Sequence, residues 1–177
     1  MEIDEIEHYL EALNTELMAR RLKVDIAVIG GVFMMFVLGN RASTKDIDII
    51  PLNVPDSTQP NKDTKIFRSA IYAVARTHGL KRAWMNDVVS SFAPDLPELM
   101  VWRSYSHLNA YLPSTDYVLA LKLLAGRERD EPDIEALCNA LHIQTRIQAQ
   151  AVLDRYASQA WQQECHVKQT LLDFFEQ

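Results

Sequence analysis

Two aspartates, Asp46 and Asp48, stand at alternate positions of the otherwise apolar run "TKDIDIIPL", residues 44–52. Because alternate residues of a strand point to the same face, a strand here places both carboxylates side by side, roughly 6 to 7 Å apart at their roots. Two like charges in one partly buried place repel each other unless a cation neutralises them. Proteins usually hold Mg²⁺ with one or two carboxylates together with the phosphates of a substrate. We therefore expect Asp46 and Asp48 to be metal ligands.

A pair of glycines, Gly30 and Gly31, precedes the aspartates. The pair ends the strand expected in "VDIAVIGG", residues 24–31, and precedes a buried helix expected at residues 32–39. Glycine lets backbone approach a ligand closely, and a helix N-terminus presents free N–H groups to a phosphate. Either feature alone is commonly structural, as a tight turn or as an edge strand with a solvated face. In this order the two features predict a shared site for a metal and a phosphate.

The order strand, Gly-Gly, helix, Arg41, Thr44, Asp46 and Asp48 resembles the signature of the nucleotidyltransferase superfamily, which has the polymerase-beta-like fold. The later run "LALKLLAGRERDEPDIEAL", residues 119–137, resembles the second half of one bacterial branch, which includes abortive-infection-type toxins of toxin–antitoxin pairs. The resemblance covers about residues 24–141. The block from the glycines to the aspartates is its specific part.

The resemblance implies transfer of a nucleoside monophosphate from an NTP to a hydroxyl acceptor. Asp46 and Asp48 would be catalytic as ligands of Mg²⁺ or Mn²⁺, and Gly30 and Gly31 would contact the phosphates. The acceptor stays open between RNA such as a tRNA end, a protein side chain and a small molecule. A cognate antitoxin is a further expected partner. The residues just before the strand would touch the phosphates or only cap the turn: Arg41, Ser43 and Thr44.

In the toxin-like branch a lysine and an aspartate on later helices complete the site. This points to Lys122 and to Asp133 or Asp130, with Arg127 as a further phosphate contact. Lys122 lies between two leucines, where a charge without a role is unexpected, although it can also extend to solvent. Arg127 or Arg129 can equally pair with one of the aspartates and only join two helices.

One departure from the superfamily concerns a third carboxylate, which many of its members add from a neighbouring strand as ligand or base. The strands expected at residues 99–105 and 108–113 contain no Asp or Glu. Either Glu98 or Asp87 reaches the site, or His107 substitutes, or the base is missing. The alternative function is therefore a non-catalytic nucleotide-binding module of the same fold. In a third interpretation the aspartates face solvent in a purely structural domain.

Periodicity and turn residues predict an α/β core at residues 1–112 and a helical region at 113–177 packed on it as one folding unit. The resemblance implies that the core is nucleotidyltransferase-like, with a mixed sheet flanked by helices. Further helices are expected at 3–22, 64–78, 83–92 and 114–127, with a surface loop at 53–63.

Composition excludes several classes of protein. The two cysteines are too few for a disulfide framework and favour a reducing cytoplasm, and the N-terminus has no obvious export signal. The longest apolar run, at 32–38, is far short of the roughly 20 residues of a membrane span. A net charge of −6 argues against binding nucleic acid over the whole surface. The basic run "RTHGLKRAW", residues 76–84, is either a local RNA contact, with Trp84 stacking on a base, or an ordinary helix end.

Overall fold

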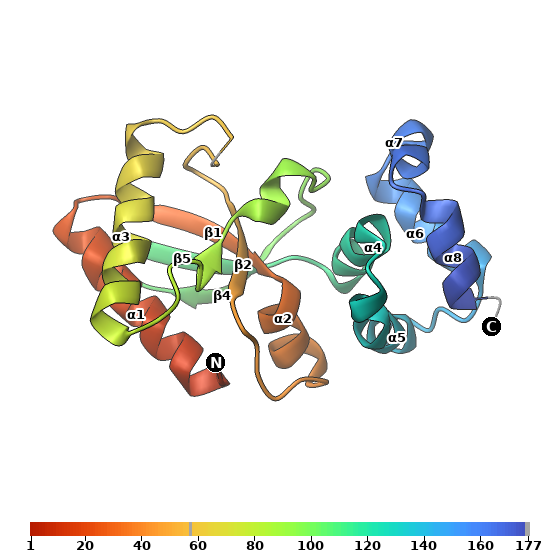
Figure 1. Ribbon diagram of the computed structural model, residues 1–177, viewed down its shortest axis with the longest axis horizontal. Helices are drawn as coiled ribbons and strands as arrows, with labels where there is room; N and C mark the ends of the chain where they lie inside the picture. The colour runs from red at the N-terminus through yellow and green to blue at the C-terminus, as the bar shows by residue number, and fades with distance from the viewer. Residues whose placement is uncertain (57, 176–177) are drawn as a thin grey trace. The chain divides into compact units, whose positions relative to one another are not determined.

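The computed structural model describes residues 1–56 and 58–175 (Figure 1). Contacts divide the chain into two compact units. The first contains Met1–Phe92 and Leu99–Leu112, and the second contains Ala93–Glu98 and the chain from Pro113 onward. The first unit is mixed α/β and the second is helical. These findings confirm a mixed sheet with helices followed by a helical region, whereas folding as one unit stays a prediction.

A mixed sheet of five strands forms the centre of the first unit, in the order β3-β2-β1-β5-β4. β1 runs parallel to β5 and antiparallel to β2, β2 runs parallel to β3, and β4 runs antiparallel to β5. The central strand β1 is almost fully buried, which explains its continuous apolar sequence. The bounds are β1 Val24–Ile29, β2 Ile47–Pro51, β3 Met85–Asn86, β4 Met100–Ser104 and β5 Leu108–Leu112.

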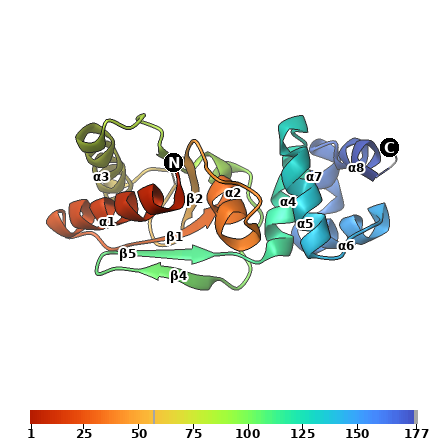
Figure 2. The ribbon, with the colours of Figure 1, turned by 90° about the horizontal axis from the view of Figure 1, so that it is seen from below.

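Two long helices, α1 (Ile3–Ala19) and α3 (Lys62–His78), pack against each other, and α1 also contacts β5 (Figure 2). The buried side chains of α1 recur every three or four residues, as expected for an amphipathic helix: Ile6, Leu10, Leu13 and Leu17. α3 begins at the cap Asn61, whose side chain accepts a hydrogen bond from the backbone of Thr64, and ends at the left-handed Gly79.

Two segments differ from the sequence prediction. The helix expected from residue 32 starts at Gly30 as α2 (Gly30–Phe33) and continues as a π-helix (Met34–Leu38) before the left-handed Gly39. The helix expected at 83–92 is wrong: this segment contains the short strand β3 and a 3₁₀ turn at Val88–Ser91. β3 exists because its backbone pairs with β2, a long-range contact without a local signal in two residues.

The second unit consists of helices α4 to α8 with a 3₁₀ turn at Glu128–Asp130. Residues 93–98 belong to it by their contacts, among them the hydrogen bond that the hydroxyl of Tyr117 donates to the carbonyl of Pro94, at 2.8 Å. Among the described residues, no helix combines the length and the apolar character that a membrane span needs. The bounds are α4 Thr115–Ala125, α5 Glu131–Ala140, α6 Arg146–Tyr156, α7 Gln159–Glu164 and α8 Val167–Phe175.

Candidate active site

Strand register brings the glycines and the aspartates together. Ile29, the last residue of β1, pairs with Asp48 of β2, so Gly30 at the start of α2 lies next to Asp48. A Cβ atom added to Gly30 would collide with Oδ2 of Asp48 and would lie 3.2 Å from its Cβ and Cγ atoms. Gly30 also has a φ of +63°, which side chains with a Cβ rarely adopt. The Asp48 carboxylate therefore occupies space that only glycine leaves open.

The amide of Asn86 holds the other oxygen of this carboxylate. Asn86 lies directly beside Asp48 in the register of β3 with β2, and its Nδ2 donates to Oδ1 of Asp48 at 3.2 Å. Sequence reasoning missed Asn86, because it placed this segment in a helix and looked only for an acid or a histidine. An amide at this position orients the carboxylate without adding negative charge.

Asp46 lies just before β2, so the prediction that both aspartates belong to the strand is right for Asp48 and wrong for Asp46. Burial still alternates as expected, with Ile47 and Ile49 buried and both aspartates half-buried. Within the described part of the chain, the Asp46 carboxylate makes no hydrogen bond or ion pair. It is thus available to an external cation.

The turn before β2 is built around Gly31 and Thr44. The Thr44 side chain is 8% exposed, and its hydroxyl donates to the carbonyl of Asp46 at 3.0 Å. A Cβ on Gly31 would lie 2.9 Å from the Thr44 Cβ and 3.9 Å from a guanidinium nitrogen of Arg41. Thr44 therefore shapes the turn, whereas Arg41 lies beside the glycines and Ser43 is exposed. Arg41 is the residue of the three that is best placed to meet an anion next to Gly31.

The residues predicted from the later helices form a cluster of their own in the second unit. Nζ of Lys122 lies 2.9 Å from Oδ1 of Asp130 and 2.7 Å from Oδ2 of Asp133. The side chains are 11%, 13% and 1% exposed, respectively. Lys122 therefore does not extend to solvent. Its charge is already opposed by two carboxylates, so a phosphate would have to displace one of them. Arg127 is exposed at the start of the following 3₁₀ turn.

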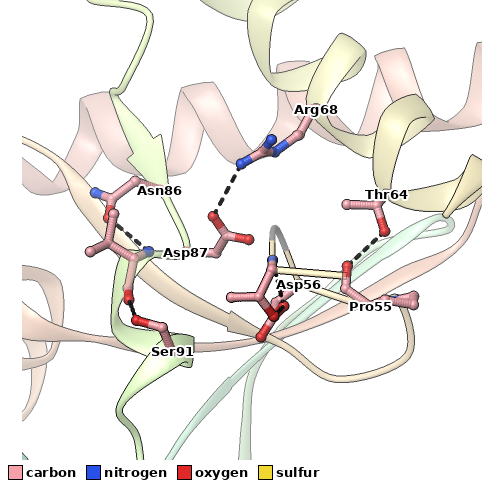
Figure 3. Close-up of polar contacts among 9 residues, drawn as sticks. Pro55, Asp56, Thr64, Arg68, Asn86, Asp87 and Ser91 are labelled. Atoms are coloured by element: carbon pink, nitrogen blue, oxygen red, sulfur yellow. Dashed lines mark hydrogen bonds and ion pairs between the residues drawn. The ribbon is translucent and has the colours of Figure 1, made fainter. Parts of the chain in front are cut away.

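The candidates for a third catalytic group lie in different places. The carbonyl of His107 accepts from the backbone of Val24, at the opposite end of β1 from Ile29 and Asp48, so His107 does not substitute for a carboxylate there. Glu98 belongs to the second unit. Asp87 follows Asn86, but its Oδ1 lies 3.8 Å from a guanidinium nitrogen of Arg68 on α3 (Figure 3).

The candidate site suits a magnesium ion that is held by two carboxylates together with a substrate. It does not resemble a site in which the protein provides all of the metal ligands. Among residues 1–56 and 58–175, no three His, Cys, Asp or Glu side chains gather in a way that could hold a metal. Mg²⁺ seldom needs such a site, since it commonly keeps waters and binds one or two carboxylates plus phosphates. The free Asp46 and the cradled Asp48 fit this pattern.

Comparison of the chain with protein-family models, curated proteins and solved structures gave no match.

Proposed function

We propose that this protein is a Mg²⁺-dependent nucleotidyltransferase, which moves a nucleoside monophosphate from an NTP to a hydroxyl acceptor. The observation that carries the proposal is the Asp48 carboxylate, which is fitted against Gly30 and lies two residues from the unpaired Asp46. A glycine pair that only made a tight turn would not require a carboxylate in the space of its missing Cβ.

Asp46 and Asp48 are the residues that would hold Mg²⁺ or Mn²⁺, which when bound neutralises the charge of the triphosphate. The backbone N–H groups of Gly30 and Gly31 would contact the phosphates, together with the guanidinium of Arg41, which lies beside Gly31. Their role is to hold the triphosphate so that its α-phosphorus faces the acceptor. Such positioning and charge neutralisation provide most of the catalysis in phosphoryl transfer.

In the reaction, the acceptor oxygen forms a bond to the α-phosphorus while the bond from that phosphorus to the bridging oxygen breaks and pyrophosphate leaves. The acceptor must also lose its hydroxyl proton. Asn86, the polar side chain that β3 brings to Asp48, is an amide and cannot take the proton. We therefore propose that the hydroxyl proton of the acceptor passes to water and not to a side chain of β3.

The same amide favours a second candidate function, a module that binds nucleotide without turnover. Such a module would keep the glycines and both aspartates and lose only the general base. It predicts Mg²⁺-dependent binding of NTP with no transfer of label. We also propose, from the resemblance alone, that the protein acts in the cytoplasm as the toxin of a toxin–antitoxin pair. Phosphate contacts by Lys122 and Arg127, and a catalytic role of Asp133, remain predictions.

Thermal unfolding with and without MgATP tests the donor site. If the free nucleotide is at about 100 times its Kd, binding stabilises the folded protein by about 2.7 kcal/mol. For a chain of this size the midpoint then rises by roughly 5 to 11 °C. Asp46→Asn and Asp48→Asn should each remove most of this rise while both variants stay folded. Glu11→Gln, which removes one negative charge at an exposed position of α1, is the matched control and should keep it. An equal rise in all four proteins would refute the assignment.

A further inference from the structure

A basic groove runs along α3 in the first unit. It consists of three adjoining hollows, of which the first two measure about 550 and 520 Å³, within the size range of ligand sites. These two share Arg20, Lys65 and Ser69, and the second and third share Arg68, Tyr72 and Arg82. We call these three hollows the α3 groove.

The charge of the α3 groove is opposite to that of the protein. Among residues 1–56 and 58–175, none with an acidic side chain lines either of its first two hollows, although the chain has 24 acidic residues and a net charge of −6. Arg20 pairs with Glu16 and Arg68 pairs with Asp87. Within the described part of the chain the other four cations have no carboxylate partner. The six cations of these two hollows are Arg20, Lys62, Lys65, Arg68, Arg76 and Arg82.

The spacing of residues on α3 suits an extended polyanion. Lys65, Ser69, Tyr72 and Arg76 recur every three or four residues, so they follow one face of the helix. The guanidinium of Arg82 lies 4.2 Å from the ring centre of Tyr72, which is 37% exposed. Cations in a row bind successive phosphates, and an exposed aromatic ring with a planar guanidinium offers a base a surface for stacking.

The third hollow connects this face of α3 to the candidate active site. Its lining includes Arg68 from α3 and both Asn86 and Asp87 from the segment of β3 (Figure 3). Asn86 in turn donates to the Asp48 carboxylate. The α3 groove therefore leads to the edge of the sheet at which the proposed donor site lies, and every residue of this path belongs to the first unit.

We propose that the α3 groove binds a single-stranded nucleic acid, the acceptor strand of the transfer reaction. Only the role as acceptor rests on the proposed function; the binding itself does not. A single strand fits better than a duplex, because Tyr72 and Arg82 offer their surface only to an unpaired base. The stacking residue is not Trp84, as the sequence suggested. Trp84 is 2% exposed, and its Nε1 donates to the carbonyl of Ile71 at 3.0 Å.

The test measures the binding of labelled 16-residue oligonucleotides by fluorescence anisotropy at several salt concentrations. The probes are one sequence as single-stranded RNA, as single-stranded DNA and as a duplex. If the four unpaired cations each contact a phosphate, a plot of the logarithm of the association constant against the logarithm of the salt concentration has a slope of about −2.8. Lys65→Gln with Arg76→Gln should reduce the slope to about −1.4 and weaken binding about tenfold or more at 0.1 M salt. Preference for the RNA or the DNA strand identifies which of the two is the natural ligand.

The matched control is Arg129→Gln with Lys168→Gln, which removes the same charge from exposed positions in the second unit. It should bind like the wild type. Equal weakening in both double variants, tighter binding of the duplex, or no oligonucleotide binding would overturn the proposal. MgATP stabilisation of the wild type, measured beside strand binding, separates the two claims. If no strand binds the wild type while MgATP still stabilises it, the acceptor groove is wrong and the donor site stands. If the strand binds and MgATP has no effect, the groove stands without the transferase.

Discussion

Gly30 is the residue on which the geometry of the candidate site depends most directly. It combines a left-handed backbone with a missing Cβ whose space is occupied by a catalytic candidate, Asp48. Glycine at a turn is common, and most such glycines can be explained by backbone freedom alone. Gly39 is of this ordinary type, because its φ is +64° and, chain neighbours aside, no atom of the described residues lies within 4 Å of the position of its Cβ.

These two glycines provide a matched pair of variants. Gly39→Ala should lower the free energy of unfolding by about 1 to 2 kcal/mol, the cost of placing alanine in the left-handed conformation. This variant should still be stabilised by MgATP. Gly30→Ala should have the same backbone cost and in addition push Asp48 out of place, so MgATP should no longer raise its unfolding midpoint. Urea unfolding measures the first effect, and melting with MgATP measures the second. If Gly30→Ala binds nucleotide as well as Gly39→Ala does, the fit of Asp48 against Gly30 has no functional role.

The sequence pattern identified the carboxylates and the glycines but not the amide of Asn86, which contacts Asp48. The sequence alone could predict the two carboxylates and the two glycines, because their spacing within apolar segments is itself the signal: Asp46, Asp48, Gly30 and Gly31. Asn86 could not be predicted in this way, because its importance comes from pairing with β2 across the sheet. Basic residues surround Trp84 in the sequence, which suggested a surface position beside the run at residues 76–84. The ring is instead buried in the core, and its indole N–H donates to a backbone carbonyl of α3.

At the scale of elements, the helices and strands with strong periodicity were predictable and the shortest ones were not. α1 was expected at 3–22 and ends at Ala19, and β4 and β5 lie inside the strands expected at 99–105 and 108–113. β3 has two residues, too few for any alternation of polar and apolar side chains. The start of α2 at Gly30 was missed because glycine is a poor helix former, and here the site requires it.

The ion pairs of Lys122 connect α4 to α5 and the 3₁₀ turn between them. Removing the lysine takes the 2.7 Å ion pair away from Asp133, whose carboxylate is 1% exposed. We expect Lys122→Met to lower the free energy of unfolding by about 3 to 5 kcal/mol, and addition of Asp133→Asn to restore part of that loss. Urea unfolding measures both. Lys168→Met, at an exposed site of the same unit, should cost little. A cost for Lys122→Met as small as that of the control would contradict this structural role.

Asp116 connects α4 to α6 by a contact that depends on pH. Burial alone would raise the pKa of its carboxyl, but hydrogen bonds from Ser114 and Tyr156 and the charge of Arg155 outweigh burial and hold the pKa below its usual 3.8. The hydroxyl of Tyr156 lies 2.9 Å and the guanidinium of Arg155 2.8 Å from its Oδ2. Because the folded-state pKa is lowered, the stabilisation is present above pH 3.8 and is lost as the pH falls through the folded value.

Asp116→Asn should therefore be less stable than the wild type at pH 7, with the difference shrinking as the pH falls below 3.8. Urea unfolding between pH 7 and pH 3 measures this change. Tyr156→Phe removes one of the hydrogen bonds that lower the pKa, so it should show a weaker pH dependence than the wild type. A difference between Asp116→Asn and the wild type that stayed constant over this range would show that the carboxylate charge does not hold α4 to α6.

At the scale of the whole molecule, charge distinguishes the α3 groove from the rest of the chain. The protein is acidic overall, and long-range repulsion disfavours binding of a polyanion to most of its surface. The α3 groove concentrates six cations on a single face of the first unit. A nucleic acid strand would therefore be directed to the groove, whose third hollow ends at Asn86 beside Asp48.

The central claim is that Asp46 and Asp48 support chemical transfer and not only binding. Its most direct test is incubation of the purified protein with each α-³²P-labelled NTP, Mg²⁺, total bacterial RNA and cell extract, followed by denaturing electrophoresis. We predict a labelled acceptor band that is absent with Asp48→Asn and is retained by Glu11→Gln. A protein that binds MgATP yet labels neither RNA nor protein nor any small molecule in the extract would contradict the claim and establish a nucleotide-binding module without turnover.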